Sequence, residues 1–163
     1  GRLANRSSMA VSPTGDLAIS VTYDPDLDNS NLNYNIQTSK YRYADGFREW
    51  SVSTGTSATF DGQAATSVAF DREGDVWVGG GELVVPKNLA SAWRFSGLNG
   101  ELLWQGVADG PRQPDKVIRL RTTRQGDVIL VGTTGVDVGT GDSDVQTLKF
   151  SRKLPRPVSP SGR

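Results

Sequence analysis

Residues 66–80 read TSVAFDREGDVWVGG, and residues 91–104 read SAWRFSGLNGELLW. The first stretch places a Gly-Asp pair between two apolar runs, and the same pattern recurs from Met9 (MAVSPTGDLAISV) and from Leu120 (LRTTRQGDVILVG). The three copies align without a gap. The chain therefore contains an internal repeat, and its period decides the architecture.

Each Gly-Asp pair predicts a short hairpin turn. The glycines of the pairs, 59 and 52 residues apart, are Gly15, Gly74 and Gly126. They lie where a hairpin needs a residue with positive φ. The aspartates that follow them are Asp16, Asp75 and Asp127. Their short side chains are predicted to hydrogen-bond the turn backbone, so we interpret them as turn-forming rather than catalytic residues.

The second half of the repeat starts with a basic residue followed by an aromatic one. These pairs are Lys40-Tyr41, Arg94-Phe95 and Lys149-Phe150. In the first two copies a glycine and then a tryptophan follow at fixed spacing, giving Gly46 with Trp50 and Gly100 with Trp104. Such a tryptophan is predicted to pack between neighbouring sheets, because stacked sheets need large apolar side chains to exclude water.

Two hairpins per repeat make four short strands, the size of one β-propeller blade. We predict an all-β fold, a β-propeller with about three four-stranded blades in this chain, forming a partial ring. The last blade is predicted to be incomplete, because three prolines interrupt residues 151–163 (SRKLPRPVSPSGR) and cannot donate to a strand ladder. The predicted segments are a lead-in or edge strand at 1–8, blades at 9–62, 63–115 and 116–151, and a proline-rich basic tail at 152–163.

Composition excludes several functions. Eighteen basic residues balance eighteen acidic ones, which argues against nucleic acid or an anionic membrane as a partner. The chain has no Cys and no His, so thiolate and imidazole metal sites and His-based triads are excluded. No apolar stretch is long enough for membrane insertion as a helix. The glycines at 79–81 are predicted to end a strand rather than to cradle a phosphate.

A weak calcium candidate lies in the first repeat. Asp24, Asp26 and Asp28 alternate as oxygen ligands do in calcium loops, and Asn29 could add a carbonyl oxygen. The full calcium-loop signature is incomplete, because the sixth position has no glycine and the twelfth no glutamate. An acidic loop of this kind is also typical of a solvated surface loop. No other cofactor is predicted.

The Gly-Asp turn, the variable acidic loop, the strand with a basic-aromatic pair and the Gly-x-x-x-Trp strand resemble a known repeat type. It is the tandem β-propeller repeat of secreted and cell-surface bacterial proteins, the seven-bladed β-propeller repeat type, and the resemblance covers about residues 8–151. It implies a β-propeller fold and an extracellular or cell-surface location. The Gly-x-x-x-Trp ending is also similar to tryptophan-docking repeats of quinone-dependent dehydrogenases, but Lys40 and Arg42 stand where that pattern has alanine and aspartate.

Three blades do not close a ring, so an open arc would expose two blade faces to water. We expect another protein chain or a second copy to complete the propeller. The chain runs from Gly1 to Arg163, which suggests a processed product or a segment of a longer protein. We predict a non-enzymatic extracellular structural or protein-interaction module, with no catalytic residues. One alternative is a lyase or glycosidase acting on polysaccharide, for which Asp71, Glu73 and Glu82 are the visible carboxylates. The other is a calcium-dependent adhesive module.

Overall fold

The computed structural model describes residues 2–24, 35–54, 61–84, 87–108, 116–134 and 144–151. These residues form three antiparallel sheets and contain no helix, so the prediction of an all-β chain is confirmed. No membrane-spanning helix is found in the residues that the structure describes. Consecutive strands pair within each sheet, so every sheet is a simple meander.

We name the sheets A, B and C in chain order. Sheet A contains β1 (Arg2–Val11), β2 (Leu17–Asp24), β3 (Asn35–Tyr41) and β4 (Arg48–Thr54). Sheet B contains β5 (Asp61–Phe70), β6 (Val76–Val84), β7 (Lys87–Phe95) and β8 (Leu102–Ala108). Sheet C contains β9 (Lys116–Thr122), β10 (Val128–Thr134) and β11 (Asp144–Phe150). The tail at 152–163 lies outside the described residues.

The first hairpin of each sheet turns at its Gly-Asp pair. Gly15, Gly74 and Gly126 have φ values of 94°, 85° and 83°, as predicted from the sequence. In sheet A the amide of Ser12 donates to the carbonyl of Asp16, and the amide of Gly15 donates back to the carbonyl of Ser12. Equivalent bonds close the turns of sheets B and C. A three-residue loop ending in a left-handed glycine therefore sets the register of all three hairpins.

The strands that open the sheets share one irregularity. The pairing of β5 with β6 shifts between Ala65 and Ser67, and that of β9 with β10 shifts at Ile118. The pairing of β1 with β2 shifts between Leu3 and Ser7. A bulge of this kind bends a strand and increases its twist. Because β1 begins at Arg2, the predicted lead-in belongs to this edge strand, and its residues Arg2, Leu3, Ser7 and Ser8 pair with β2.

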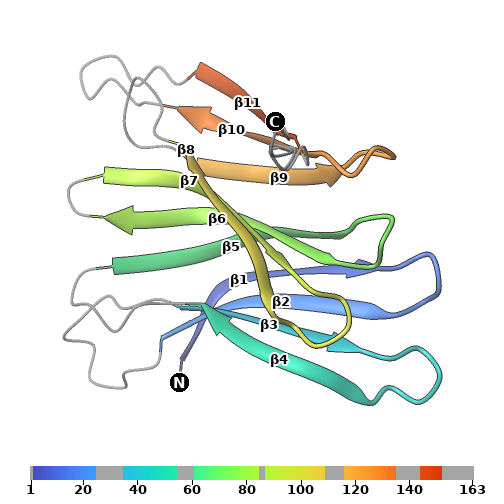
Figure 1. Cartoon of the computed structure of the whole chain (residues 1–163). Helices are drawn as coiled ribbons and strands as arrows, with labels where there is room; N and C mark the ends of the chain where they lie inside the picture. The colour runs from blue at the N-terminus through green and yellow to red at the C-terminus, as the bar shows by residue number, and fades with distance from the viewer. Residues whose placement is uncertain are drawn as a thin grey trace, which may run out of the picture.

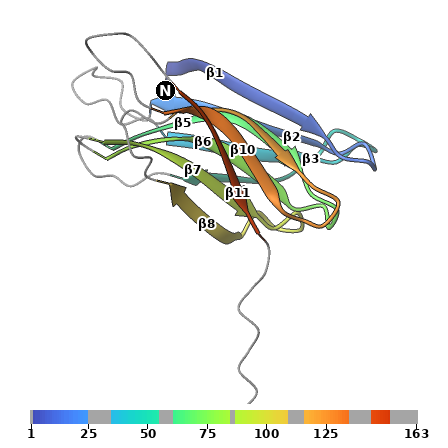
Figure 2. The same cartoon turned by 90° about the horizontal axis from the view of Figure 1, so that it is seen from above.

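The three sheets stack face to face in chain order, as Figure 1 shows from the bottom to the top of the picture. β5 packs against β1, β2 and β3, and β9 packs against β5, β6 and β7. Figure 2 shows the same stack from above, with β1 and β8 on opposite sides. The first strands of the three sheets therefore lie next to one another at one side of the stack.

Each sheet has two chemically different faces. The cation face carries the basic residue of the repeat, which is Lys40, Arg94 or Lys149. The opposite face, which we call the apolar face, carries these residues: Met9 and Ile19 in sheet A, Val68 and Val78 in sheet B, and Leu120 and Leu130 in sheet C. The cation face of sheet A packs on the apolar face of sheet B, and the cation face of sheet B packs on the apolar face of sheet C. All three sheets therefore face the same way in the stack, with the cation faces of sheets A and B directed towards the next sheet in the chain.

The glycines at 79–81 lie in the middle of β6 and do not end it, so that prediction was wrong. A Cβ atom at Gly79 would lie 3.1 Å from Cδ1 of Leu120 and 3.3 Å from Cδ2 of Leu130. A side chain there would push sheet C away from sheet B. Close approach of the two sheets is the physical reason for a glycine at this position.

Candidate functional site

Each sheet contains an ion pair between the aspartate of its Gly-Asp turn and the basic residue of its third strand. The N···O distances are 3.2 Å for Lys40 and Asp16, 2.7 Å for Arg94 and Asp75, and 2.6 Å for Lys149 and Asp127. The two sequence signals, Gly-Asp and basic-aromatic, therefore meet in space. Each pair ties the first hairpin of a sheet to its third strand.

In sheets A and B the aspartate of the Gly-Asp pair binds the second hairpin rather than its own turn, which corrects the prediction from the sequence for Asp16 and Asp75. Oδ1 of Asp16 accepts from the amide of Tyr43 at 3.0 Å, and Oδ1 of Asp75 accepts from the amide of Gly97 at 2.9 Å. Both amides belong to the second hairpin of the same sheet. The turn itself is held by the residue four positions earlier; for example, Oγ of Ser12 accepts from the amide of Asp16 at 2.9 Å.

The same arrangement recurs in the other two turns. Oδ1 of Asp71 accepts from the amide of Asp75 at 3.0 Å, and Oγ1 of Thr123 accepts from the amide of Asp127 at 3.1 Å. The side chain of Ser12, Asp71 or Thr123 thus accepts from the amide of the aspartate in the Gly-Asp pair. In sheets A and B the carboxylate of that aspartate can therefore bind the next hairpin instead of its own turn. The signal was present in the sequence as Ser, Asp or Thr three residues before each Gly-Asp pair.

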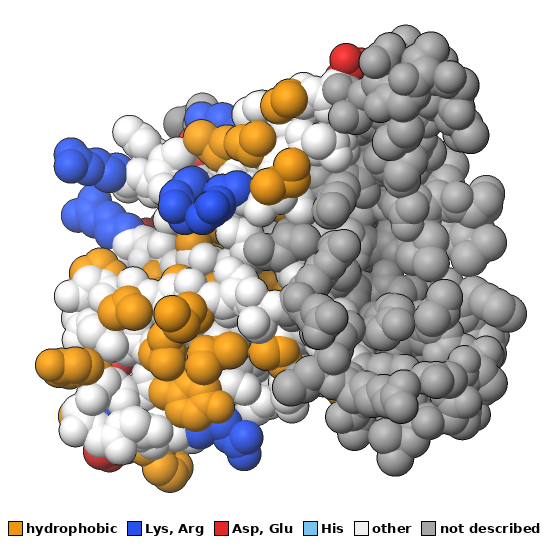
Figure 3. All heavy atoms as spheres, turned by 180° about the vertical axis from the view of Figure 1, so that it is seen from behind, with side chains coloured by type: hydrophobic (Ala, Val, Ile, Leu, Met, Phe, Trp, Pro, Cys, Tyr) orange, Lys and Arg blue, Asp and Glu red, His pale blue; other side chains and the backbone are white. Residues whose placement is uncertain are grey.

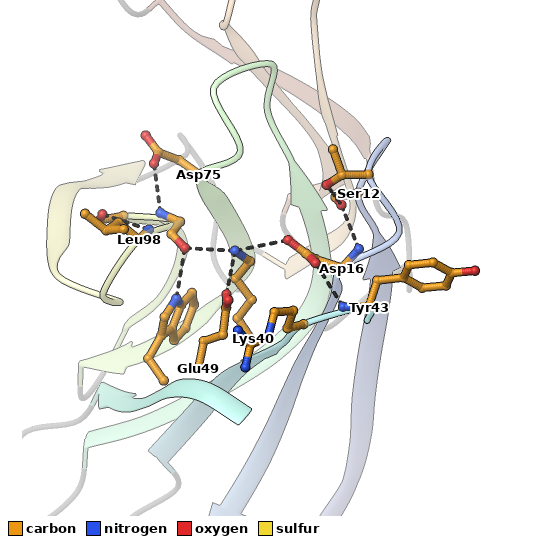
Figure 4. A network of polar contacts seen from close by, with 12 residues as sticks. Ser12, Asp16, Lys40, Tyr43, Glu49, Asp75 and Leu98 are labelled. Carbon is orange, nitrogen blue, oxygen red and sulfur yellow. Dashed lines mark hydrogen bonds and ion pairs between the residues drawn. The ribbon is translucent and has the colours of Figure 1, made fainter. Parts of the chain in front are cut away.

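Lys40 connects sheet A to sheet B (Figure 4). Its Nζ atom lies 3.2 Å from Oδ2 of Asp16 and 2.8 Å from Oε2 of Glu49, and it donates to the carbonyl oxygen of Gly97 at 3.0 Å. Gly97 lies in the turn between β7 and β8 of sheet B. The ammonium group thus uses its three donors on two carboxylates of its own sheet and one main-chain carbonyl of the next.

Trp50 binds the same carbonyl. Its Nε1 atom donates to the oxygen of Gly97 at 3.2 Å, and its side chain is buried in the core between sheets A and B. A Cβ atom at Gly100 would lie 2.8 Å from Cε3 of Trp50, so the ring packs directly against a glycine. In the next junction Trp104 lies with its ring centroid 5.5 Å from that of Trp77 and 5.1 Å from that of Phe150. The prediction that these tryptophans pack between sheets is confirmed.

This environment shifts two pKa values. The amide of Tyr43 lowers the pKa of Asp16 below its ordinary value of 3.8; burial opposes this, and Lys40 adds to the lowering. Burial alone would lower the pKa of Lys40. The carboxylates of Glu49 and Asp16 outweigh that effect and raise the pKa above 10.5. The charged form of each partner is therefore favoured in the folded chain.

Sheet B holds its cation differently. Arg94 lies 3.1 Å from Oδ2 of the fully buried Asp71, and Trp77 donates from Nε1 to the same oxygen at 3.0 Å. The other oxygen of Asp71 accepts from the amides of Glu73 and Asp75. Four donors therefore surround this carboxylate. It has the contacts of a buried structural anion, and no lone pair is directed towards solvent.

The polysaccharide-enzyme hypothesis also names Glu73 and Glu82 as carboxylates. Glu73 lies in the turn after β5 and approaches Arg94 at 3.8 Å. Glu82 lies in β6, and its side chain is outside the described residues. Asp71 therefore has a structural explanation, whereas the role of Glu82 stays untested.

The calcium candidates fall mostly outside the described residues. Asp24 is the last residue of β2, and Asp26, Asp28 and Asn29 follow it in the loop at 25–34, which the structure does not describe. Among the described residues no group of three or more carboxylates is arranged to hold a metal ion. The calcium loop remains a prediction from the sequence.

The apolar face of sheet A is open. Met9, Val68 and Leu120 are equivalent positions of the repeat, yet Met9 is 73% exposed whereas Val68 and Leu120 are 3% and 0% exposed. Val11 is likewise 65% exposed, against 9% for the equivalent Phe70. The difference arises because no described sheet lies on this face. Repeat positions that are buried in the core at both internal junctions are therefore exposed to solvent on sheet A.

The cation face of sheet C is open as well. The Lys149 side chain is 57% exposed, whereas those of Lys40 and Arg94 are 11% and 13% exposed. Three large hydrophobic side chains of this sheet are exposed: Ile118, Val131 and Val145. Figure 3, which views the molecule from behind, shows hydrophobic side chains beside lysine and arginine side chains on that side of the stack. The two ends of the stack thus display the two halves of an internal junction.

No protein-family model matches the sequence, and comparison with the curated proteins gives no match. The candidate site is therefore defined by the chain's own geometry. It consists of the two open faces of sheets A and C.

Proposed function

We propose that this chain is a segment of a β-propeller and acts as a non-enzymatic structural and protein-interaction module, outside the cell or at its surface. The three sheets are its blades, and the open faces of sheets A and C are where further sheets bind. Three stacked antiparallel meanders of blade size support the fold assignment. The extracellular location rests on the resemblance of the repeat to those of secreted and cell-surface bacterial proteins.

The exposure of Met9 is the observation that carries the proposal. At the equivalent positions, Val68 and Leu120 are covered by the preceding sheet. Burial of a methionine or valine side chain contributes about 1.5–3 kcal/mol. Covering Met9 and Val11 therefore supplies roughly 3–6 kcal/mol towards binding, before the costs of association. Such a contribution favours a protein partner on this face.

A non-enzymatic role is supported by the way the polar residues are used. Asp16, Lys40, Asp71 and Arg94 contact one another or the main chain, and their contacts join hairpins and sheets. Activity on a panel of polysaccharides would contradict this part of the proposal. The calcium-dependent adhesive module is tested separately, by the melting temperature in calcium. A calcium-induced rise that Asp26→Asn with Asp28→Asn abolishes would assign that loop as a metal site.

Met9 provides a direct test, because it is the only methionine of the chain. Protein isolated from its natural source without unfolding is treated with dilute peroxide, and conversion of Met9 to its sulfoxide is followed by mass spectrometry of the peptide that contains it. We expect Met9 to be oxidised much more slowly than in the same protein in denaturant, because a partner sheet covers it. Oxidation at the rate of the denatured chain would show a bare face and contradict the proposal.

A further inference from the structure

The two internal junctions share polar contacts besides their apolar packing. Oγ of Ser8 accepts from the amide of Val68 at 3.2 Å, and Oγ of Ser67 accepts from the amide of Leu120 at 3.0 Å. Ser8 and Ser67 are equivalent positions of the repeat, as are Val68 and Leu120. The repeat therefore fixes how one sheet sits on the next, and the A–B and B–C junctions follow the same rule.

That rule assigns contacts to the two open faces. Tyr43 is the repeat equivalent of Gly97, and Lys149 is the equivalent of Lys40. Val131 is the equivalent of Gly79, and Met9 is the equivalent of Leu120. Within the chain, a Cβ atom placed on Gly79 would lie 3.2 Å from Cβ of Leu120. A sheet A placed on sheet C by the internal rule would bring Tyr43 to Lys149 and Met9 to Val131.

We propose that the cation face of sheet C binds the apolar face of sheet A in a second copy of this chain, head to tail. Nζ of Lys149 then donates to the carbonyl oxygen of Tyr43, as Lys40 does to Gly97 within the chain. Met9 packs on Val131. This inference rests on the proposed function and specifies its partner.

Head-to-tail binding uses both open faces, whereas symmetric binding does not. Two copies joined through the cation faces of their sheets C would place Arg119, Arg121 and Lys149 against the same residues of the partner. All three side chains are exposed cations, and among the described residues only Lys149 is paired with a carboxylate, that of Asp127. The arginines of the two copies would therefore repel one another. Two copies joined through the apolar faces of sheets A would bury Met9 but leave both cation faces in water. A contact between different faces propagates from copy to copy until a ring closes.

Cysteine cross-linking tests the direction, and the absence of native cysteine keeps the background clean. Purified Met9→Cys and Val131→Cys proteins are mixed under mild oxidation, and the disulfide-linked dimers are distinguished by mass spectrometry. The Cβ separation at the equivalent internal position, 3.2 Å, is close to the roughly 3.5–4.5 Å of disulfides. We expect the mixed dimer to form at least about tenfold faster than dimers of either variant alone, because binding holds the two thiols at a high effective concentration.

Leu98→Cys serves as the matched control for Val131→Cys. Leu98 is 87% exposed at the tip of the turn between β7 and β8, away from the proposed junction. Its mixed dimer with Met9→Cys should form only at the collisional rate. Equal rates for the two mixtures, or dimers of Met9→Cys alone as the main product, would overturn the head-to-tail proposal.

The outcomes separate this inference from the proposed function. If Met9 is protected in protein from the natural source but the purified variants give no mixed dimer above the control, the partner is a different chain. The second-copy proposal then fails and the interaction module stands. If Met9 is also unprotected in protein from the natural source, both fail.

Discussion

The Nζ atom of Lys40 in sheet A donates to the carbonyl oxygen of Gly97 in sheet B at 3.0 Å, 57 residues further along the chain. Trp50 donates to the same oxygen, and the amide of Gly97 donates to Asp75. The main-chain N–H and C=O of one turn residue, Gly97, thus join the ion pair of sheet B to the ion pair of sheet A. The junction between sheets A and B combines an apolar core with this polar contact.

Replacement of Lys40 by methionine should destabilise the fold. It leaves the carbonyl of Gly97 with one donor fewer and removes the cation between Asp16 and Glu49. Hydrogen bonds to charged groups contribute about 1.5–3 kcal/mol, so we expect a loss of roughly 2 kcal/mol in the free energy of unfolding. Urea denaturation followed by circular dichroism measures it.

Arg42→Met is the control for that change. Arg42 pairs with Asp45 at 3.1 Å, but both side chains are about half exposed. Such an exposed surface pair contributes little to stability, so we expect a much smaller loss than for Lys40→Met. If both variants lose the same stability, the contact of Lys40 with sheet B has no special weight.

Trp50→Ala should reduce stability more than any change at a turn tip. The indole is buried between two sheets and covers Gly100, so its removal leaves a cavity and takes one of two donors from the carbonyl of Gly97. We expect a loss of about 3–5 kcal/mol, measured by urea denaturation. Leu98→Ala, at an exposed tip, should change stability by less than about 0.5 kcal/mol. A loss near 1 kcal/mol for Trp50→Ala would mean that the ring is not part of the core.

Gly97→Ala and Gly46→Ala separate steric crowding from backbone strain. A Cβ atom at Gly97 would clash with the carbonyl oxygen of Gly74, whereas one at Gly46 would meet nothing within 4 Å. Gly46 has φ 69°, so alanine there is strained by about 1 kcal/mol. Gly97→Ala should cost more, about 2–3 kcal/mol, because the main chain must move. Thermal unfolding of both variants measures these losses. A larger loss of stability for Gly46→Ala than for Gly97→Ala would contradict the packing of these turns.

Acid should weaken the fold partly through Asp16. Its pKa is lower in the folded chain than the ordinary 3.8, so folding favours its ionised form. The resulting stability is present above pH 3.8 and is lost as the pH falls through the lower, folded-state pKa. In urea titrations from about pH 6 to about pH 3, Asp16→Asn should lose stability at the upper end and show a flatter acid limb. An unchanged acid limb would exclude a contribution from Asp16.

One substitution is predicted to strengthen association. Arg119 stands where Ser8 and Ser67 accept amide hydrogen bonds across the internal junctions, and arginine has no acceptor. In Arg119→Ser, the hydroxyl should accept from the amide of Met9 in the next copy. One such bond contributes about 1 kcal/mol, which is roughly a fivefold decrease in Kd. Sedimentation equilibrium measures it.

Arg121→Ser controls for the loss of positive charge on the same face. It removes a cation but introduces a hydroxyl at a position where the internal junctions have none. If it strengthens association as much as Arg119→Ser does, the effect is electrostatic and the proposed register is wrong.

Much of the fold could be predicted from the sequence because the repeat places its turn residues at fixed spacing. The glycines at 15, 74 and 126, and the packing of Trp50, followed from local rules and from the need to fill space between sheets. The strand position of Gly79 could not be predicted, because the reason for a glycine there is the leucine side chains of another sheet.

The candidate site was harder to predict than the fold. The partner of Lys40 includes a main-chain carbonyl, which leaves no residue-type signal in the sequence. The bridging role of Asp16 was missed because an aspartate after a turn glycine has a simpler local explanation. Exposure of Met9 becomes informative only when the repeat alignment is combined with the stacking order, since the residue itself reads as an ordinary core methionine.

The most direct test of the account is the solution mass of the purified chain, measured by light scattering over a range of concentrations. Binding of sheet C to sheet A of another copy predicts a mass that is a multiple of 17.5 kDa at high concentration. Met9→Lys should return it to 17.5 kDa without changing the circular dichroism spectrum. A folded wild-type chain that stays at 17.5 kDa at every concentration would contradict the head-to-tail binding of sheet C to sheet A.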